Sequence, residues 1–348
     1  MTFAIRNKTR SFRVTVTPAD GEPVVISNMQ GDEGFAVEFR VTRTMDDKLG
    51  SLEVTFRNLP PDLLGPIEGA QVRRVDDIDA ALAGVQLFED GPDQDGADAG
   101  PSGFASIDVE AGYDGNLTRV GRAVGCRILS DREDDDCTNV TTIHALENLD
   151  GLLLGVPSQT FPAGAGTHEA FDYLRRCLAL GPGNATVDLW TAILGVSQFQ
   201  SPFHATSGDA LELLRHLTQF LAVRWWVDDR QIWICGREGW ANFGQVAPYL
   251  PGAPKQLPPL LRRPRRVDGG EVECVTFLAP DVAPGELVVL SDATLTFPGV
   301  TPSQQEILRA DVPPGVYRVQ VISHAGSSSD DGEDSFTSTI RLRGMKGI

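Results

Sequence analysis

Alternating apolar and polar positions dominate the N-terminal part of the chain. Phe12, Val14 and Val16 alternate with polar residues, and similar runs follow at 35–41 and 52–56. A two-residue period is typical of a β-strand with one buried face. The last run must end at Pro60-Pro61, because proline lacks the amide proton that a sheet needs. The pattern therefore predicts antiparallel sheet with one solvated face.

The stretch from Phe104 to Leu149 predicts three further strands in a meander. Apolar residues alternate from 107, and the pair Asp114-Gly115 suits the positive φ of a tight turn. A second strand is expected over 120–129 and a third over 138–144, with an acidic turn between them. No pattern in this stretch is typical of a reaction centre, so we expect a sheet that serves assembly.

The pattern changes to a mixed one after about residue 150. Residues 168–180 and 209–222 carry apolar side chains at helical spacing. The second of these helices runs into a predicted hairpin over 223–235, which turns at Asp228-Asp229 and contains three tryptophans. We expect the helix to pack its leucines on the hairpin, which makes this part of the chain α+β.

Alternation returns near Glu271, and strands are expected at 272–276, 287–290, 315–321 and 336–342. The chain is therefore expected to be mainly β with an inserted α+β part. The expected boundaries give a first β domain at 1–150, a mixed domain at 151–268 and a second β domain at 269–348.

Two charged segments stand apart from these elements. Residues 89–103 are acidic and rich in Gly and Pro, which predicts a projecting loop. They do not fit the EF-hand calcium pattern, because its first and last ligand positions would be Gly91 and Ser102. A basic, proline-rich linker is expected at 256–267, and it holds the candidate contact residues Arg262, Arg263, Arg265 and Arg266. They either pair with local carboxylates or contact an acidic neighbouring subunit, because arginine favours bidentate carboxylate pairing.

The formal charge of -18 over 348 residues narrows the possible functions. It argues against a sequence-reading nucleic-acid binder and against docking on anionic membrane. An acidic wall could still line a path along which DNA slides, because it repels phosphates. The five cysteines are widely spaced without C-x-x-C, which predicts free thiols and no metal site. We expect no signal peptide, no membrane span and no cofactor.

Catalytic motifs are missing from the sequence, which has no G-x-S-x-G, H-E-x-x-H or Walker A pattern. We therefore expect no enzyme. Trp225, Trp226 and Trp233 could form a sugar-binding platform, but alternation places the first two on opposite faces, so at least one is expected in the core. His324 is expected to make a surface hydrogen bond, with pH sensing as the alternative.

Six short motifs follow one another along the chain. They are Val54-x-Phe56-Arg57-Asn58-Leu59, the hairpin at Ala111-Gly112-Tyr113-Asp114-Gly115, Thr160-Phe161 with Gly164-x-Gly166-Thr167, helix 209–222 with hairpin 225–235, Leu278-Ala279-Pro280-x-x-x-Pro284-Gly285, and Gly315-x-Tyr317-Arg318-Val319 with His324. In this order they resemble the baseplate hub proteins of tailed phages, a family that includes the Mu-like and P2-like hubs and tail protein D. The chain departs from that family at Gly121-Arg122, where an aromatic residue and glycine are usual, and at Asp228-Asp229, where Asp-Gly is usual.

The resemblance implies two tube-type antiparallel β-barrel domains flanking the mixed domain. It also implies a homotrimeric ring that adapts a sixfold tail tube to a threefold central spike. Implied partners are the chain itself, the central spike protein, the tail tube or distal tail protein, other baseplate proteins, and genomic DNA that passes through the lumen without sequence-specific binding. The implied place is the virion baseplate, after assembly in the cytoplasm of the bacterial host. Two alternatives stay open: a carbohydrate-binding or cell-wall-degrading tail protein, and the hub of a tailocin or contractile injection system.

Overall fold

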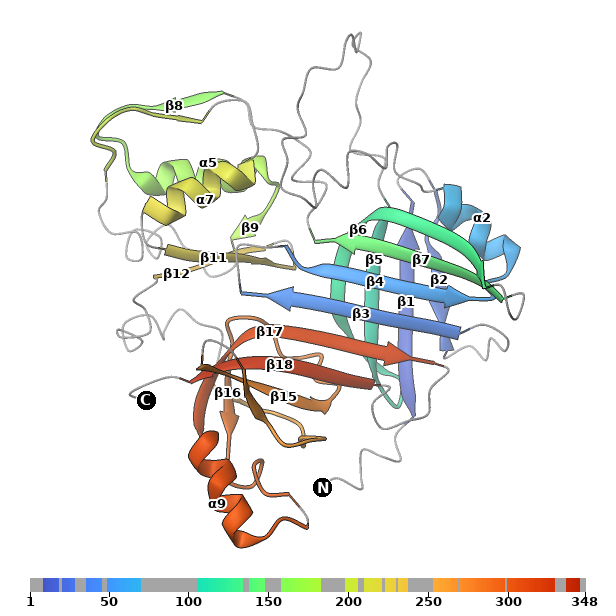
Figure 1. Cartoon of the computed structure of the whole chain (residues 1–348). Coiled ribbons are helices and arrows are strands. Elements are labelled where there is room, and N and C mark those ends of the chain that lie inside the picture. The colour runs from blue at the N-terminus through green and yellow to red at the C-terminus, as the bar shows by residue number, and fades with distance from the viewer. Residues whose placement is uncertain are drawn as a thin grey trace.

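Strands dominate the structure, a computed structural model (Figure 1). It describes residues 9–18, 21–28, 36–45, 49–69, 105–133, 138–147, 158–182, 198–205, 210–220, 223–229, 231–236, 253–267, 270–297, 299–328 and 336–344. Most strands in these ranges belong to one largely antiparallel sheet, and helices accompany smaller sheets beside it. The predicted fold class, mainly β with an inserted α+β part, is confirmed.

The first β unit comprises the N-terminal elements. They are β1 (Arg10–Thr17), β2 (Val24–Ser27), β3 (Ala36–Thr44), β4 (Ser51–Arg57), α2 (Pro61–Gly69), β5 (Ser106–Tyr113), β6 (Asn116–Glu133) and β7 (Thr138–Leu146). The strands follow the order β3-β4-β7-β6-β5-β1-β2, so the predicted meander of β5, β6 and β7 is confirmed. Alternate side chains such as Val37, Phe39 and Val41 point into one apolar core, as the two-residue period predicts.

The second β unit comprises the C-terminal elements. They are β13 (Lys255–Gln256), β14 (Arg265–Val267), β15 (Glu271–Phe277), β16 (Leu287–Leu290), α9 (Pro302–Asp311), β17 (Gly315–Ser327) and β18 (Phe336–Gly344). Its strands surround a separate core that includes Cys274, Val319 and Ile340. The segment expected to be a linker contributes two strands, because β13 pairs with β16 and β14 pairs with β15. Both short strands therefore pair with strands of the second β unit.

Strand β17 joins the two β units. Its C-terminal half runs antiparallel to β3, from Val321 opposite Thr44 to Ser327 opposite Glu38. The same strand pairs with β16 at its start and with β18 along most of its length. Backbone hydrogen bonds therefore link the two units into one continuous sheet.

The mixed unit lies between the β units along the chain. Its elements are β8 (Gln159–Phe161), α5 (Thr167–Cys177), β9 (Gly181–Pro182), β10 (Phe203–Ala205), α7 (Ala210–Phe220), β11 (Val223–Asp228) and β12 (Gln231–Gly236). Figure 1 shows α5 and α7 lying over the β11–β12 hairpin. Leu214 and Leu217 of α7 share a core with Trp225, so the predicted packing of leucines on the hairpin is confirmed.

The acidic segment 89–103 lies outside the described residues. The prediction that it forms a projecting loop, and the calcium reading of its carboxylates, therefore stay untested. Within the described ranges, no helix is both long and apolar enough to cross a membrane.

Candidate functional site

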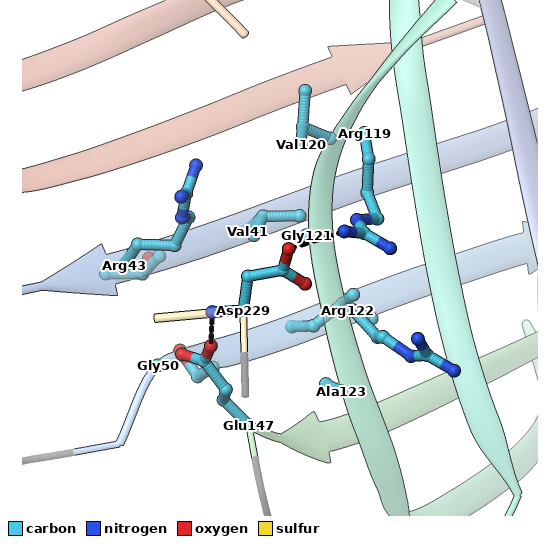
Figure 2. A pocket seen from close by; sticks show the side chains of 13 residues that line it. Val41, Arg43, Gly50, Arg119, Val120, Gly121, Arg122, Ala123, Glu147 and Asp229 are labelled. Carbon is cyan, nitrogen blue, oxygen red and sulfur yellow. Dashed lines mark hydrogen bonds and ion pairs between the residues drawn. The ribbon is translucent and has the colours of Figure 1, made fainter. Parts of the chain in front are cut away.

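A small cavity lies where the β11–β12 hairpin meets the first β unit (Figure 2). Its volume is about 60 Å³, and its walls come from β3, β4, β6, the end of β7 and the hairpin turn. Gly121 on β6 permits this close packing, because a Cβ atom there would lie 2.4 Å from Cγ1 of Val41. We call the contact around the cavity the joint. Its ionisable members are Arg43, Arg119, Glu147, Asp228 and Asp229.

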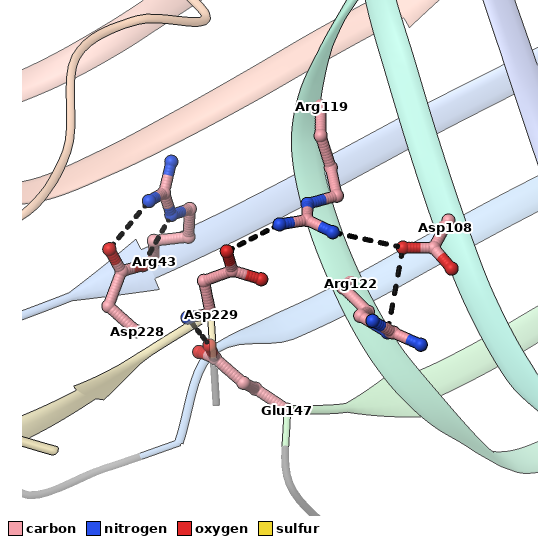
Figure 3. A network of polar contacts seen from close by, with 7 residues as sticks. All are labelled: Arg43, Asp108, Arg119, Arg122, Glu147, Asp228 and Asp229. Atoms are coloured by element: carbon pink, nitrogen blue, oxygen red, sulfur yellow. Dashed lines mark hydrogen bonds and ion pairs between the residues drawn. The ribbon is translucent and has the colours of Figure 1, made fainter. Parts of the chain in front are cut away.

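Arg43 and Asp228 form a bidentate ion pair across the joint (Figure 3). Arg43 Nε donates to Asp228 Oδ1 and Nη2 donates to Oδ2, both at 2.6 Å. The two side chains are only 15% and 8% exposed. Burial alone would lower the pKa of Arg43, but Asp228 and the other carboxylates nearby raise it overall, so the guanidinium stays charged. This pair ties the mixed unit to β3.

Asp229 makes the second ionic link of the joint. Arg119 Nη2 on β6 donates to Asp229 Oδ2 at 2.5 Å, and Arg119 Nη1 lies 3.9 Å from Asp108 Oδ1 on β5. Arg122 Nε lies 3.6 Å from the same Asp108 oxygen. Asp229 holds a positive φ of 51°, which glycine would adopt more readily. Asp229 therefore adopts a backbone conformation that is less favourable for it than for glycine, and its carboxylate gains an ion pair with Arg119.

Glu147 is the third acidic residue of the joint. It follows β7, is 5% exposed, and its Oε1 accepts a hydrogen bond from the backbone N–H of Asp229. Burial, and after it the Asp228 carboxylate, raises the pKa of Glu147 to about 8. The carboxyl is therefore largely protonated at neutral pH. A neutral acid fits here, because Arg43 and Arg119 already pair with the two aspartates.

A further contact of the hairpin reaches the second β unit. Trp226 is 1% exposed and packs with Met45 and with Trp233, whose ring centroid lies 6.2 Å away at an interplanar angle of 12°. Gly285 holds a φ of 83°, and a Cβ atom there would lie 2.4 Å from the Trp226 ring. The hairpin therefore contacts both β units.

The candidate arginine cluster lies at the edge of the second β unit, in and before β14. Arg265 Nη2 lies 2.7 Å from Glu273 Oε1, and Arg266 Nε lies 3.1 Å from Asp311 Oδ1. The other two arginines of the cluster are exposed. These contacts favour local pairing for Arg265 and Arg266, and the contact with a neighbouring subunit stays a prediction.

Burial decides two of the candidate side-chain roles. Trp225 and Trp226 are 2% and 1% exposed and belong to different apolar clusters, so neither offers a sugar-binding platform. His324 is fully buried, and its Nδ1 lies 2.8 Å from Ser338 Oγ. The expected surface hydrogen bond of His324 is therefore wrong. Burial, with the nearby Arg43 charge, lowers the pKa of His324 to about 3, so the ring is neutral at physiological pH.

The face of the shared sheet that points away from the cores is polar. Side chains pair across the neighbouring strands β17, β3, β4 and β7, directly opposite each other in three cases and diagonally for Glu38 and Arg57. The closest distances are 3.2 Å for Thr42–Ser323, 3.1 Å for Thr55–Thr142, 3.6 Å for Glu38–Arg57 and 3.3 Å for Glu53–His144. In the described part of these strands, each acidic side chain on this face therefore has a basic neighbour. We call this surface the polar sheet face.

Comparison with known proteins identifies the fold. No family model and no curated protein matches the sequence. Among solved structures, the 43 kDa tail protein of prophage MuSo2 from Shewanella oneidensis aligns over 95% of this chain and 96% of its own, with a TM-score of 0.51 and 9% identity. This chain has the fold of a phage tail protein.

Two further solved structures align with lower TM-scores. A tail protein from Neisseria meningitidis MC58 aligns over 95% of this chain and 96% of its own, with a TM-score of 0.47 and 9% identity. The E. coli c3393 protein, a component of the type VI secretion system, aligns over 89% of this chain and 73% of its own, with a TM-score of 0.46 and 8% identity.

Proposed function

We propose that this protein is the structural baseplate hub of a phage tail. Three copies form a ring between the sixfold tail tube and the threefold central spike. The likeness to the MuSo2 tail protein supports a tail role, because it covers 95% of the chain. The observation that carries the hub proposal is the single sheet that two β units share through β3 and β17. Three chains, each with two joined units, supply six units around one axis.

Free sheet edges support ring closure. In the main strand order of the shared sheet, β2 lies at one end and β14 lies at the other. An edge strand presents backbone groups that can pair with a strand of another chain. Val25 on β2 is 44% exposed, as expected of a strand that a neighbouring chain would cover. We assign the contacts between chains to these edges.

The polar sheet face is the proposed wall of the DNA channel. Its side chains are largely hydroxyls, and its carboxylates Glu38 and Glu53 lie beside Arg57 and His144. DNA binds proteins strongly where basic side chains displace condensed counterions. A charge-balanced wall gives the phosphates little to bind, so DNA passes without being held. We therefore propose a hydroxyl-rich wall at this face, in place of the acidic wall that the total charge of the chain suggested.

The proposed partners follow from this position. They are the central spike protein, the tail tube or distal tail protein and other baseplate proteins, with genomic DNA in the lumen. The protein occupies the tail baseplate of the virion after assembly in the cytoplasm of the bacterial host. Its function in this account is symmetric assembly, not catalysis.

To test the proposal, the purified protein is mixed with the spike and tube proteins encoded beside it, and the masses of the complexes are measured by native mass spectrometry. A complex with three copies of this chain on one trimeric spike is expected. Binding of a single copy, or no binding to either partner, would contradict the hub role. A hub of a tailocin or contractile injection system would give the same complex, and genes for a capsid beside it distinguish the phage. Burial of Trp225 and Trp226 removes these two rings from the sugar-binding alternative, which would then depend on Trp233 and the acidic loops.

A further inference from the structure

Glu147 is a buried acid at a contact between two units of the fold. It lies in the first β unit, yet its Oε1 accepts the backbone N–H of Asp229 from the mixed unit. Figures 2 and 3 show its carboxyl reaching the hairpin turn beside the cavity. This contact exists only while the hairpin is docked, so the surroundings of the Glu147 carboxyl depend on docking.

The charges around Glu147 balance without it. Among the described residues, the charged or titratable groups near it are Arg43 on β3, Arg119 and Arg122 on β6, Asp108 on β5, Asp228 and Asp229 on the hairpin, and His324 on β17 behind Arg43. Each of the three arginines lies within 4 Å of one of the three aspartates. An ionised Glu147 would be a fourth, unmatched negative charge on a carboxyl that is only 5% exposed.

We propose that docking of the β11–β12 hairpin on the first β unit takes up one proton at the Glu147 carboxyl, so that the joint weakens as the pH rises from mild acid to about 8. When the hairpin leaves, water reaches the carboxyl and its proton is released. The joint is thus a proton-linked contact between the mixed unit and the shared sheet.

The direction follows from the two states of the carboxyl. In the undocked state water solvates Glu147, whose ordinary pKa is 4.5, whereas burial and Asp228 raise the pKa to about 8 when the hairpin is docked. Between pH 4.5 and about 8, the docked state therefore binds one more proton than the undocked state. Docking is favoured most below pH 4.5, weakens across the interval, and becomes independent of this group above pH 8.

Hydrogen exchange of the intact protein, read by mass spectrometry on peptides from 223–236, tests the proposal. After correction for intrinsic exchange rates, protection of the hairpin amides should fall by up to about tenfold per pH unit between pH 5.5 and 7.5, as one-proton linkage requires. The Glu147→Gln variant, which mimics the protonated acid, should keep its protection constant. The matched control is Glu38→Gln, whose carboxyl is 44% exposed at its surface pair. It should retain the wild-type slope.

Two results would overturn the proposal. A flat wild-type profile would do so without any variant. If hairpin protection in Glu147→Gln still fell with pH as steeply as in the unsubstituted protein, the proton would belong to another group. If Glu147→Gln does not fold, Glu147→Met also lacks a titratable group, and it must abolish the slope.

Discussion

Replacing Arg43 by alanine removes the cation that holds Asp228 in the joint. The variant leaves a carboxylate that is 8% exposed without its bidentate partner. Breaking a buried ion pair on one side costs about 3–5 kcal/mol, because the remaining charge stays desolvated. Arg43 is still 15% exposed, so we expect the free energy of unfolding to fall by an amount near the lower end of this range, about 3 kcal/mol.

Urea unfolding measured by tryptophan fluorescence tests this magnitude, because three tryptophans lie in the hairpin that Arg43 anchors. If unfolding occurs in separate steps, the step that exposes these tryptophans is the one to compare. The control is Arg57→Ala, whose pair with Glu38 spans 3.6 Å and is 33% and 44% exposed. The free energy of unfolding of this control should fall by only about 0–1 kcal/mol.

The double variant Arg43→Met with Asp228→Leu provides a second check. It removes both charges, so it should be more stable than Arg43→Ala. If Arg43→Ala loses no more stability than Arg57→Ala, the hairpin is not held by this pair, and the account of the joint fails.

Three further predictions concern other buried positions. Gly285→Ala should lower the free energy of unfolding, measured in urea, by about 2–4 kcal/mol, because it adds a clash with Trp226 to the strain of positive φ. Gly299→Ala, which has positive φ but open space around it, should lower the free energy of unfolding by only about 1–2 kcal/mol. The folded pKa of His324 lies below its ordinary 6.5, so the unfolded chain binds the extra proton. The contribution of His324 to stability should therefore fall by up to roughly 1.4 kcal/mol per pH unit from pH 6.5 to about 3. The difference between unfolding curves of His324→Gln and of the unsubstituted protein across this range separates this contribution from the opposite one of Glu147. Burial raises the pKa of the Cys274 thiol to about 12, so a thiol reagent followed by peptide mass spectrometry should label Cys274 no faster than the protein unfolds.

Local patterns were sufficient to predict individual elements. Alternation in Val37, Phe39 and Val41 predicted β3, because side chains of a strand point alternately to its two faces. Helical leucine spacing followed by an aromatic run predicted α7 and its hairpin, because both signals come from neighbouring residues. The mainly β fold with an α+β insertion follows from these local signals.

Long-range contacts could not be predicted in the same way. The pairing of Val321 with Thr44 joins residues far apart in the sequence, and no local period encodes it. Burial of His324 depends on that pairing, so its expected surface position was wrong. The one sequence signal of the joint was the Asp228-Asp229 turn. Aspartate at a position suited to glycine indicates a side-chain contact, but its partner Arg119 lies on a distant strand.

The most direct test of the hub proposal is the mass of the purified protein in solution by light scattering, alone over a range of concentrations and then with the neighbouring spike protein. The account predicts a particle of three times the 37.5 kDa chain mass, either alone or once the spike is added. A persistent 37.5 kDa monomer that is indifferent to the spike would contradict it.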